Sequence, residues 1–244
     1  MKIGNITFDS KTANSFGLIV AGAGSFNPAL PDMTAYTVPG RNGDIFLDNH
    51  RYKNIDVTYP GFIPSAFISN SQSIRNWILT PNEYKKLEDN FDTTHFRMAI
   101  GKSVNFSPVN ENKAANVSIT FNCKPQRFLT SGAVSYNTLS GVTRTNPTEF
   151  KAFPIITLKD PMSVGYIEFV NDDGYYKMTA TRAYTGTVTI DCENRLIYSG
   201  SNNLNDLFSG DFPEFLPGNT QINWSGMSGI GGLGIEIVPG WWEL

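Results

Sequence analysis

Apolar and polar residues alternate along many short segments of this chain, which is the pattern of strands with one buried face. Residues 54–59 and 166–170 are clear examples. Turn signals separate such segments at roughly ten-residue intervals, a spacing typical of β-sandwiches. We therefore predict a mainly β protein with strands at residues 3–8, 16–20, 36–38, 45–47, 54–59, 96–100, 117–121, 134–136, 153–158, 166–170, 175–178, 187–190, 196–198, 212–216, 221–224 and 235–238.

One segment has helical periodicity instead. Ile74, Trp77 and Ile78 are spaced at i, i+3 and i+4, so they predict one apolar helix face. Ser71 or Ser73 is a suitable N-cap, and Pro81 predicts the end of the helix. We expect a second, short turn over residues 84–87, and Pro125 to end the strand at 117–121.

The strongest turn signal is Asn42-Gly43. A two-residue type I′ turn needs positive φ at both central positions, which Asn and Gly adopt at little cost. Tyr36 and Val38 precede this pair at alternate positions, and Ile45 and Leu47 follow it at alternate positions. The pattern predicts a β-hairpin over residues 36–47.

The chain has 244 residues, enough for one large β domain or two small ones. Residues 131–147 are rich in Ser, Thr, Asn and Gly, which favours a linker. Up to Ser135 the chain has 13 basic and 10 acidic residues, and after it 6 and 12. This contrast fits two domains with different surfaces, so we predict domains at 1–133 and 146–244, joined by a linker at 134–145.

Composition narrows the classes of partner. The formal net charge of −3 provides no strong field for nucleic acid. Cys123 and Cys192 end the strand-like segments 119–123 and 188–192 of separate domains, so we expect buried free thiols and a reducing compartment. No segment reaches the roughly 20 apolar residues of a membrane span. These features favour a cytoplasmic protein, or one that leaves the cell inside a larger particle.

No residue pattern selects a catalytic, metal or cofactor site. His50 and His95 lie among polar, turn-like residues, and no ligand pair has the short spacing of a zinc site. Glu168, Asp191 and Glu193 are candidate carboxylates for glycoside hydrolysis, but their spacing does not single them out. Residues 229–234 match the dinucleotide-binding glycine pattern, yet a strand rather than a helix follows them, so we expect a loop.

Four groups of segments, taken together, carry a family resemblance. They are 38–44 with Tyr52 and 55–59; 74–78 with 84–89; 96–99 with 119–128; and 146–147, 154–156, 190–193, 210–213, 217–219 and 241–244. In this order and spacing, over nearly the whole chain, they resemble the distal tail (Dit) proteins of long-tailed bacteriophages and their prophage relatives.

The resemblance implies an N-terminal β-sandwich with one helix and a C-terminal galectin-like β-sandwich. It implies a homo-hexameric ring that joins the major tail (tube) protein to the tail-associated tip protein and lets DNA pass through its centre. Receptor-binding or other baseplate proteins would attach to the outer C-terminal domain. The implied location is the virion tail tip, after assembly in the host cytoplasm, and the implied role involves no catalysis, cofactor or membrane.

The predicted hairpin is our candidate for the contact between subunits. A ring needs an adhesive surface on both sides of each subunit, and a hairpin can extend a neighbour's sheet. We expect this contact to involve Tyr36, Val38, Arg41, Asn42, Gly43, Asp44, Ile45 and Leu47.

The alternative function is a carbohydrate-binding module for attachment to the host surface. Aromatic residues of the second domain are its basis, although aromatics in a sandwich more often belong to the core. The candidate sugar contacts are Tyr175, Tyr176 and Tyr184, and the wider pool includes Trp224, Trp241 and Trp242.

Overall fold

The computed structural model describes residues 4–22, 27–159, 163–226 and 235–244. Its contacts divide the chain into two compact units, residues 1–127 with Leu244, and residues 128–243. Unit 1 and unit 2 are used below for these two parts. The division lies a few residues before the predicted boundary at 133, and whether each unit folds independently stays a prediction.

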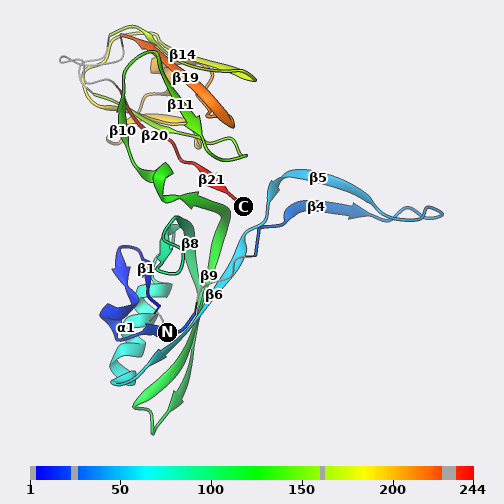
Figure 1. Cartoon of the computed structure of the whole chain (residues 1–244), viewed down its shortest axis with the longest axis vertical. Coiled ribbons are helices and arrows are strands. Elements are labelled where there is room, and N and C mark those ends of the chain that lie inside the picture. The colour runs from blue at the N-terminus through cyan, green and yellow to red at the C-terminus, as the bar shows by residue number, and fades with distance from the viewer. Residues whose placement is uncertain (1–3, 23–26, 160–162, 227–234) are drawn as a thin grey trace. The chain divides into compact units, whose positions relative to one another are not determined.

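Unit 1 is built on one curled antiparallel sheet (Figure 1). Gly4, just before the first strand of the sheet, exchanges backbone hydrogen bonds with Val20 in the last strand, which brings the two ends of the sheet together. The strands, in spatial order, are β2 (Lys11–Thr12), β1 (Ile6–Phe8), β7 (Lys85–Asp89), β8 (His95–Val109), β9 (Ala114–Leu129), β6 (Ile55–Ile63) and β3 (Ile19–Val20).

Helix α1 (Phe67–Leu79) packs against the curled sheet and closes the core of unit 1. Trp77 Nε1 donates a hydrogen bond of 2.8 Å to the carbonyl oxygen of Phe8, and the rings of Phe8 and Phe121 lie 4.9 Å apart. The predicted face of Ile74, Trp77 and Ile78 is confirmed as buried, and the helix ends before Pro81.

Four local predictions about the helix and the curled sheet of unit 1 were wrong. The helix begins at Phe67 after a left-handed Ala66, so Ser71 and Ser73 lie inside it and do not cap it. Residues 84–87 largely belong to strand β7, and residues 13–16 form the short 3-10 helix η1 (Ala13–Phe16), so the strand predicted at 16–20 is only β3. Strand β9 continues through Pro125; its pairing with β6 stops at Cys123, so no hydrogen bond to β6 is lost there.

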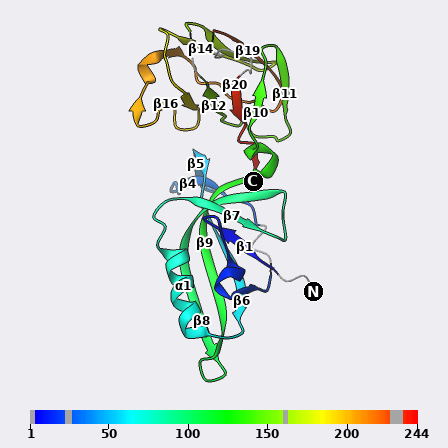
Figure 2. The same cartoon turned by 90° about the vertical axis from the view of Figure 1, so that its left-hand side faces the viewer.

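Unit 2 is a β-sandwich of two antiparallel sheets (Figure 2). One sheet has the order β10 (Tyr136–Thr138), β20 (Ile235–Val238), β12 (Ile155–Leu158), β15 (Val188–Asp191), β16 (Leu196–Ser199) and β17 (Asn202–Asn203). The other has the order β11 (Val142–Asn146), β19 (Gly218–Ser225), β13 (Tyr166–Asn171), β14 (Gly174–Ala180) and β18 (Phe208–Gly210). Buried side chains of both sheets form one core. The predicted mainly β class is confirmed.

The segment expected to be a linker contains strands. Within residues 134–145, β10 joins one sheet of the sandwich and most of β11 joins the other.

Two short 3-10 helices, η2 (Thr130–Ala133) and η3 (Asn205–Leu207), lie elsewhere in unit 2, and β21 (Trp242–Glu243) pairs with the end of β9. The strand predicted at 212–216 is only an isolated bridge between Ala152 and Phe215.

The two cysteines agree with the prediction, because Cys123 and Cys192 are free, buried and in different units. Burial raises the pKa of the Cys123 thiol to about 12, so this thiol stays protonated and unreactive at neutral pH. The glycine-rich loop expected at 229–234 lies outside the described residues.

Candidate functional site

Strands β4 (Pro31–Tyr36) and β5 (Ile45–Tyr52) form a two-stranded sheet of their own, called the arm below (Figure 1). Tyr36 pairs with Ile45, and Thr34 pairs with Leu47. Almost every residue of β5 is exposed, in contrast to the alternating burial of the other long strands. The predicted hairpin is therefore confirmed, but its strands do not belong to the large sheet of unit 1.

Both faces of the arm carry large apolar side chains. Directly paired residues of an antiparallel ladder lie on the same face, so the pairing places Tyr36, Ile45 and Leu47 on one face. Phe46 and Met33 lie on the opposite face by the same alternation. The exposed fractions are 53% for Tyr36, 54% for Leu47 and 64% for Phe46. An isolated two-stranded hairpin is marginally stable in water, and exposed apolar side chains of this size are typical of interaction surfaces.

The loop at the tip of the arm corrects the predicted turn. Asn42 does not have a positive φ, so Asn42-Gly43 is not a type I′ turn. The tight turn is Val38-Pro39-Gly40-Arg41, in which the Arg41 N–H donates to the Val38 carbonyl oxygen at 3.2 Å and Gly40 has a φ of 80°. Proline followed by a glycine with positive φ is the signature of a type II turn. The strands are joined by residues 37–44, closed by a hydrogen bond from Thr37 to Asp44.

The base of the arm is fixed by charged side chains. Arg51 donates to Oδ2 of Asp32 at 2.7 Å, and Lys53 Nζ lies 3.4 Å from Oδ1. The register shifts between Pro31 and Met33, and His50 adopts a φ of 54° in the extra length of β5. The hydrogen bond from Arg51 lowers the pKa of Asp32, so this carboxylate is ionised at neutral pH.

All eight predicted contact residues lie on the arm or in its loop. Tyr36, Ile45 and Leu47 share one exposed face, and Val38 is exposed in the loop. The remaining four occupy the tip, at Arg41, Asn42, Gly43 and Asp44. Sequence reasoning missed Met33, Phe46 and Leu30 of the same exposed segment. An uninterrupted apolar run at 45–47 was the available signal, because it places apolar side chains on both faces of a strand.

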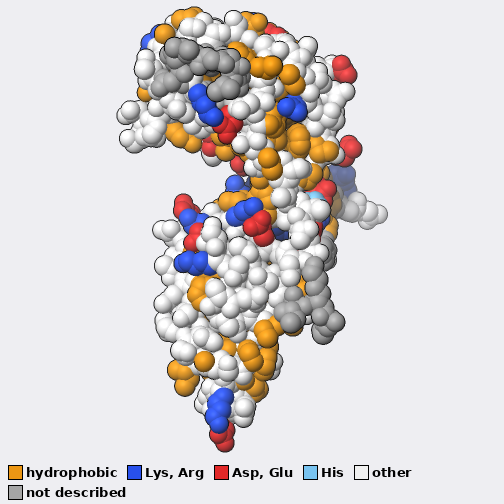
Figure 3. All heavy atoms as spheres, turned by 60° about the vertical axis from the view of Figure 1, so that its left-hand side comes forward, with side chains coloured by type: hydrophobic (Ala, Val, Ile, Leu, Met, Phe, Trp, Pro, Cys, Tyr) orange, Lys and Arg blue, Asp and Glu red, His pale blue; other side chains and the backbone are white. Residues whose placement is uncertain are grey.

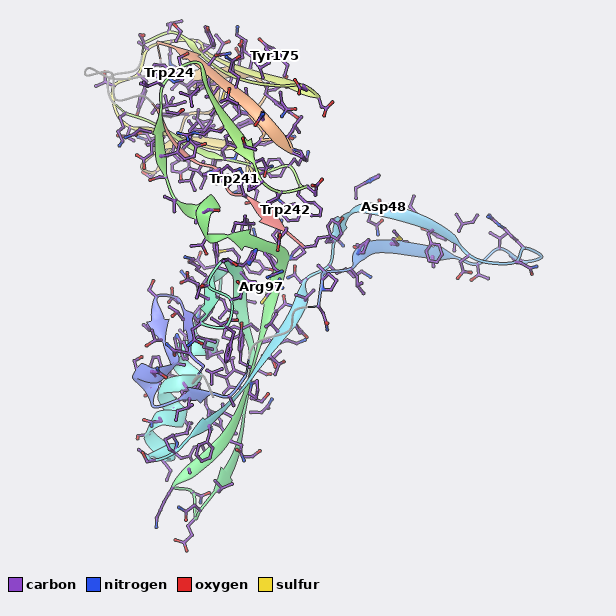
Figure 4. All side chains as sticks on the ribbon, viewed as in Figure 1. Asp48, Arg97, Tyr175, Trp224, Trp241 and Trp242 are labelled. Atoms are coloured by element: carbon purple, nitrogen blue, oxygen red, sulfur yellow. The ribbon has the colours of Figure 1, made fainter. Side chains whose placement is uncertain are left out.

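The three candidate sugar contacts lie in different surroundings. Tyr175 is exposed on the outer face of the five-stranded sheet in unit 2 (Figure 4). Tyr176 packs against the core and donates to Glu214, and Tyr184 also packs against the core. Trp224, Trp241 and Trp242 are partly buried against the same core. Only Tyr175 therefore presents an open aromatic surface.

Tyr175 is held by a polar network on the outer sheet face. Its hydroxyl donates to Glu168 Oε2 at 2.9 Å, Asn223 donates to Oε1 at 3.2 Å, and Lys177 lies 3.5 Å from Oε2. Burial alone would raise the pKa of Glu168, but these hydrogen bonds and the Lys177 charge lower it. Because Glu168 pairs with Lys177 rather than with Tyr175, the tyrosine hydroxyl reaches diagonally across the strands.

The candidate histidines and carboxylates lie in separate surroundings. His50 is exposed in the arm. Asp92, Thr94 and Arg127 approach Nδ1 of His95 at 2.8 to 3.3 Å. The Asp191 carboxylate accepts hydrogen bonds from the backbone N–H and the side-chain amide of Asn194, which stabilises a turn. In the described part of the chain, no cluster of three potential metal ligands occurs.

Two further surface properties bear on partners. On the face shown in Figure 3, basic and acidic side chains are interspersed rather than gathered by sign. Among the described residues, no helix is both long and apolar enough to cross a bilayer.

Comparison with known proteins identifies the fold. No protein-family model matches the chain, and no curated protein sequence matches it. The fold is that of a phage tail hub protein of the Dit type. It is similar to the crystal structure of Dit (gp 19.1) of SPP1, described as a paradigm of the hub adsorption apparatus in phages that infect Gram-positive hosts. The match covers 100% of both chains with a TM-score of 0.74, at 9% sequence identity.

Proposed function

We propose that this chain is a structural hub protein at the tail tip of a long-tailed bacteriophage. The observation that carries the proposal is a Dit-like fold over the whole chain, with an arm whose two faces are both apolar and exposed. An arm of this kind has no core of its own to pack on, so another molecule covers its apolar side chains in this proposal. The role is assembly rather than catalysis.

The arm makes the contact between neighbouring copies in this proposal. A contact between the arm of one subunit and a different surface of the next is heterologous, and heterologous contacts close into rings when the rotation permits. Tyr36, Ile45 and Leu47 pack on the neighbour, and Arg41 and Asp44 at the tip fix the register. Six copies form a ring between the tail tube protein and the tail-associated tip protein, and DNA passes through the ring.

The remaining partners follow from the same proposal. Unit 2 holds receptor-binding or other baseplate proteins, and the protein resides at the virion tail tip after assembly in the host cytoplasm.

The solution mass of the purified protein tests the ring. We expect a species near six times 27.0 kDa by light scattering, with the fraction of rings rising with protein concentration. Phe46→Lys and Leu47→Lys each place a charge on one face of the arm, and we expect one or both to give monomers. Ile68→Lys is the matched control, because Ile68 is 74% exposed on α1.

Two results would contradict the proposal. The first is a wild-type protein that stays at 27.0 kDa up to the highest soluble concentration. The second is a ring that forms equally well in wild type, Phe46→Lys and Leu47→Lys.

A second candidate function is favoured by the outer sheet face of unit 2. Tyr175 is 57% exposed, and its hydroxyl donates a hydrogen bond to Glu168. Asn223, Lys177 and Glu168 surround it with hydrogen-bonding groups. An aromatic platform beside polar groups suits a sugar ring, whose C–H face is apolar and whose edge carries hydroxyls. We propose that this face binds saccharides of a cell surface.

Glycan-array binding by the full chain tests this second proposal. The array carries oligosaccharides ending in galactose, glucose, N-acetylglucosamine and rhamnose. We expect Tyr175→Ala to weaken binding by roughly tenfold, the effect of losing about 1.4 kcal/mol. Leu196→Ala, an exposed position on the other sheet, is the control and should bind as wild type. Absence of binding to every glycan, or equal binding by Tyr175→Ala, would remove this candidate.

A further inference from the structure

The tip of the arm carries an Asn42-Gly43 pair that is exposed to solvent. Both residues are exposed, and a Cβ placed on Gly43 would meet no atom within 4 Å. The described contacts of the loop flank the pair: Arg41 N–H bonds to Val38, and Thr37 bonds to Asp44. The pair itself lies between these two contacts, in backbone that belongs to neither strand.

We propose that Asn42 is a site of spontaneous deamidation in the unassembled chain. The backbone nitrogen of Gly43 gives up its proton to water and attacks Cγ of Asn42. A new C–N bond forms, the bond from Cγ to the side-chain nitrogen breaks, and ammonia leaves. Water then opens the cyclic imide at either carbonyl, which yields aspartate or isoaspartate. The reaction consumes one water and releases one ammonia, and it needs no cofactor.

The local structure favours this step for two reasons. Glycine leaves the attacking nitrogen uncrowded because it has no Cβ, and asparagine is among the chemically labile side chains of proteins. The loop is exposed irregular backbone, which samples conformations that a helix or strand forbids. The product adds a negative charge between Arg41 and Asp44, so the tip becomes net negative.

Asn70 provides a comparison within the same chain. It is also followed by a small residue, Ser71, but both lie inside helix α1. The Asn70 side chain donates to the Ser65 carbonyl oxygen at 3.2 Å, and helical geometry keeps the Ser71 nitrogen away from Cγ of Asn70. Asn70 should therefore stay intact under conditions in which Asn42 reacts.

Mass spectrometry of the intact, folded protein tests the proposal. The protein and a synthetic peptide of residues 36–47 are incubated in the same mildly alkaline buffer until half of the peptide is deamidated. We then digest the protein and expect its Asn42 peptide to be converted to within about twofold of the free peptide, with the Asn70 peptide unchanged. Asn42→Ser should lose the mass change. An Asn42 peptide that is as intact as the Asn70 peptide would overturn the proposal.

The effect of the new charge rests on the proposed ring and is measured separately. We expect Asn42→Asp to associate more slowly than Asn42→Ser, because a charge at the rim of an interface mainly changes association rates. If wild type deamidates but forms no ring under any condition, the deamidation site stands and the proposed hub function fails. If wild type forms rings but Asn42 stays intact in free subunits, the proposed hub function stands and the proposed deamidation site fails.

Discussion

The arm and the β13–β14 hairpin are both antiparallel strand pairs, yet they differ in the burial of their apolar side chains. In β13–β14, alternate residues such as Phe169 and Met178 are fully buried in the sandwich core, and the outer face carries Glu168 and Lys177. In the arm, Phe46 and Leu47 on opposite faces are both exposed. The comparison teaches that local sequence can specify a hairpin without specifying whether its apolar side chains are covered.

The largest contrast is expected in the stability of the free subunit. Phe169→Ala should lower the free energy of unfolding by about 3–5 kcal/mol, because it leaves a cavity in the core of unit 2. Denaturant unfolding followed by fluorescence measures this change. A loss of less than about 1 kcal/mol would show that the sandwich does not depend on this buried face.

An intermediate effect is expected at the base of the arm. The Asp32 carboxylate has a lowered pKa in the folded chain, so its stabilising contribution is complete above the unfolded value of 3.8. That contribution is lost as the pH falls through the lower, folded pKa. Asp32→Asn should therefore lower the hydrogen-exchange protection factors, which are corrected for the intrinsic exchange rate, in β4 and β5 at neutral pH. Acidification through the folded pKa should lower the same protection factors in wild type.

Exchange in β13 and β14 is the internal control for that measurement. It should be unaffected by Asp32→Asn, because Asp32 bonds to Arg51 and Lys53 of the arm segment. Equal protection of the arm in wild type and Asp32→Asn at neutral pH would contradict the role assigned to this carboxylate.

The smallest effect is expected at the apolar positions of the arm itself. Phe46→Ala should change the stability of the free subunit by no more than about 0.5 kcal/mol, because the side chain is 64% exposed. Thermal unfolding of a dilute, monomeric sample measures this change. A large destabilisation would mean that the arm packs on its own subunit, and it would remove the reason to invoke a neighbour.

Much of the fold could be predicted from alternation and turn residues. Strands such as 54–59 and 166–170, the face of Ile74, Trp77 and Ile78, and the hairpin at 36–47 were all readable, because they depend on local periodicity. The wrong predictions concern segments whose secondary structure depends on pairing with residues far away in the chain. Leu87 is in a strand rather than a turn because it pairs with Phe8, which is 79 positions away in the chain.

The candidate sites show the same limit. From the sequence we named the tip and one face of the arm. We did not use the apolar run at 45–47, which places Phe46 on the second face, where the structure pairs it with Ala35. The sequence offered three tyrosines as sugar contacts, and only the sandwich separated the open Tyr175 from the packed Tyr176 and Tyr184. Periodicity states which residues share a face, but not whether that face is covered.

By itself, the sequence determined the β class, the single amphipathic helix and the place of the hairpin, because these follow from the spacing of neighbouring residues. Tertiary structure decided which of two similar hairpins would be buried. Burial depends on what the rest of the chain brings against a strand. For Phe169 the chain supplies the second sheet, whereas Phe46 is left 64% exposed.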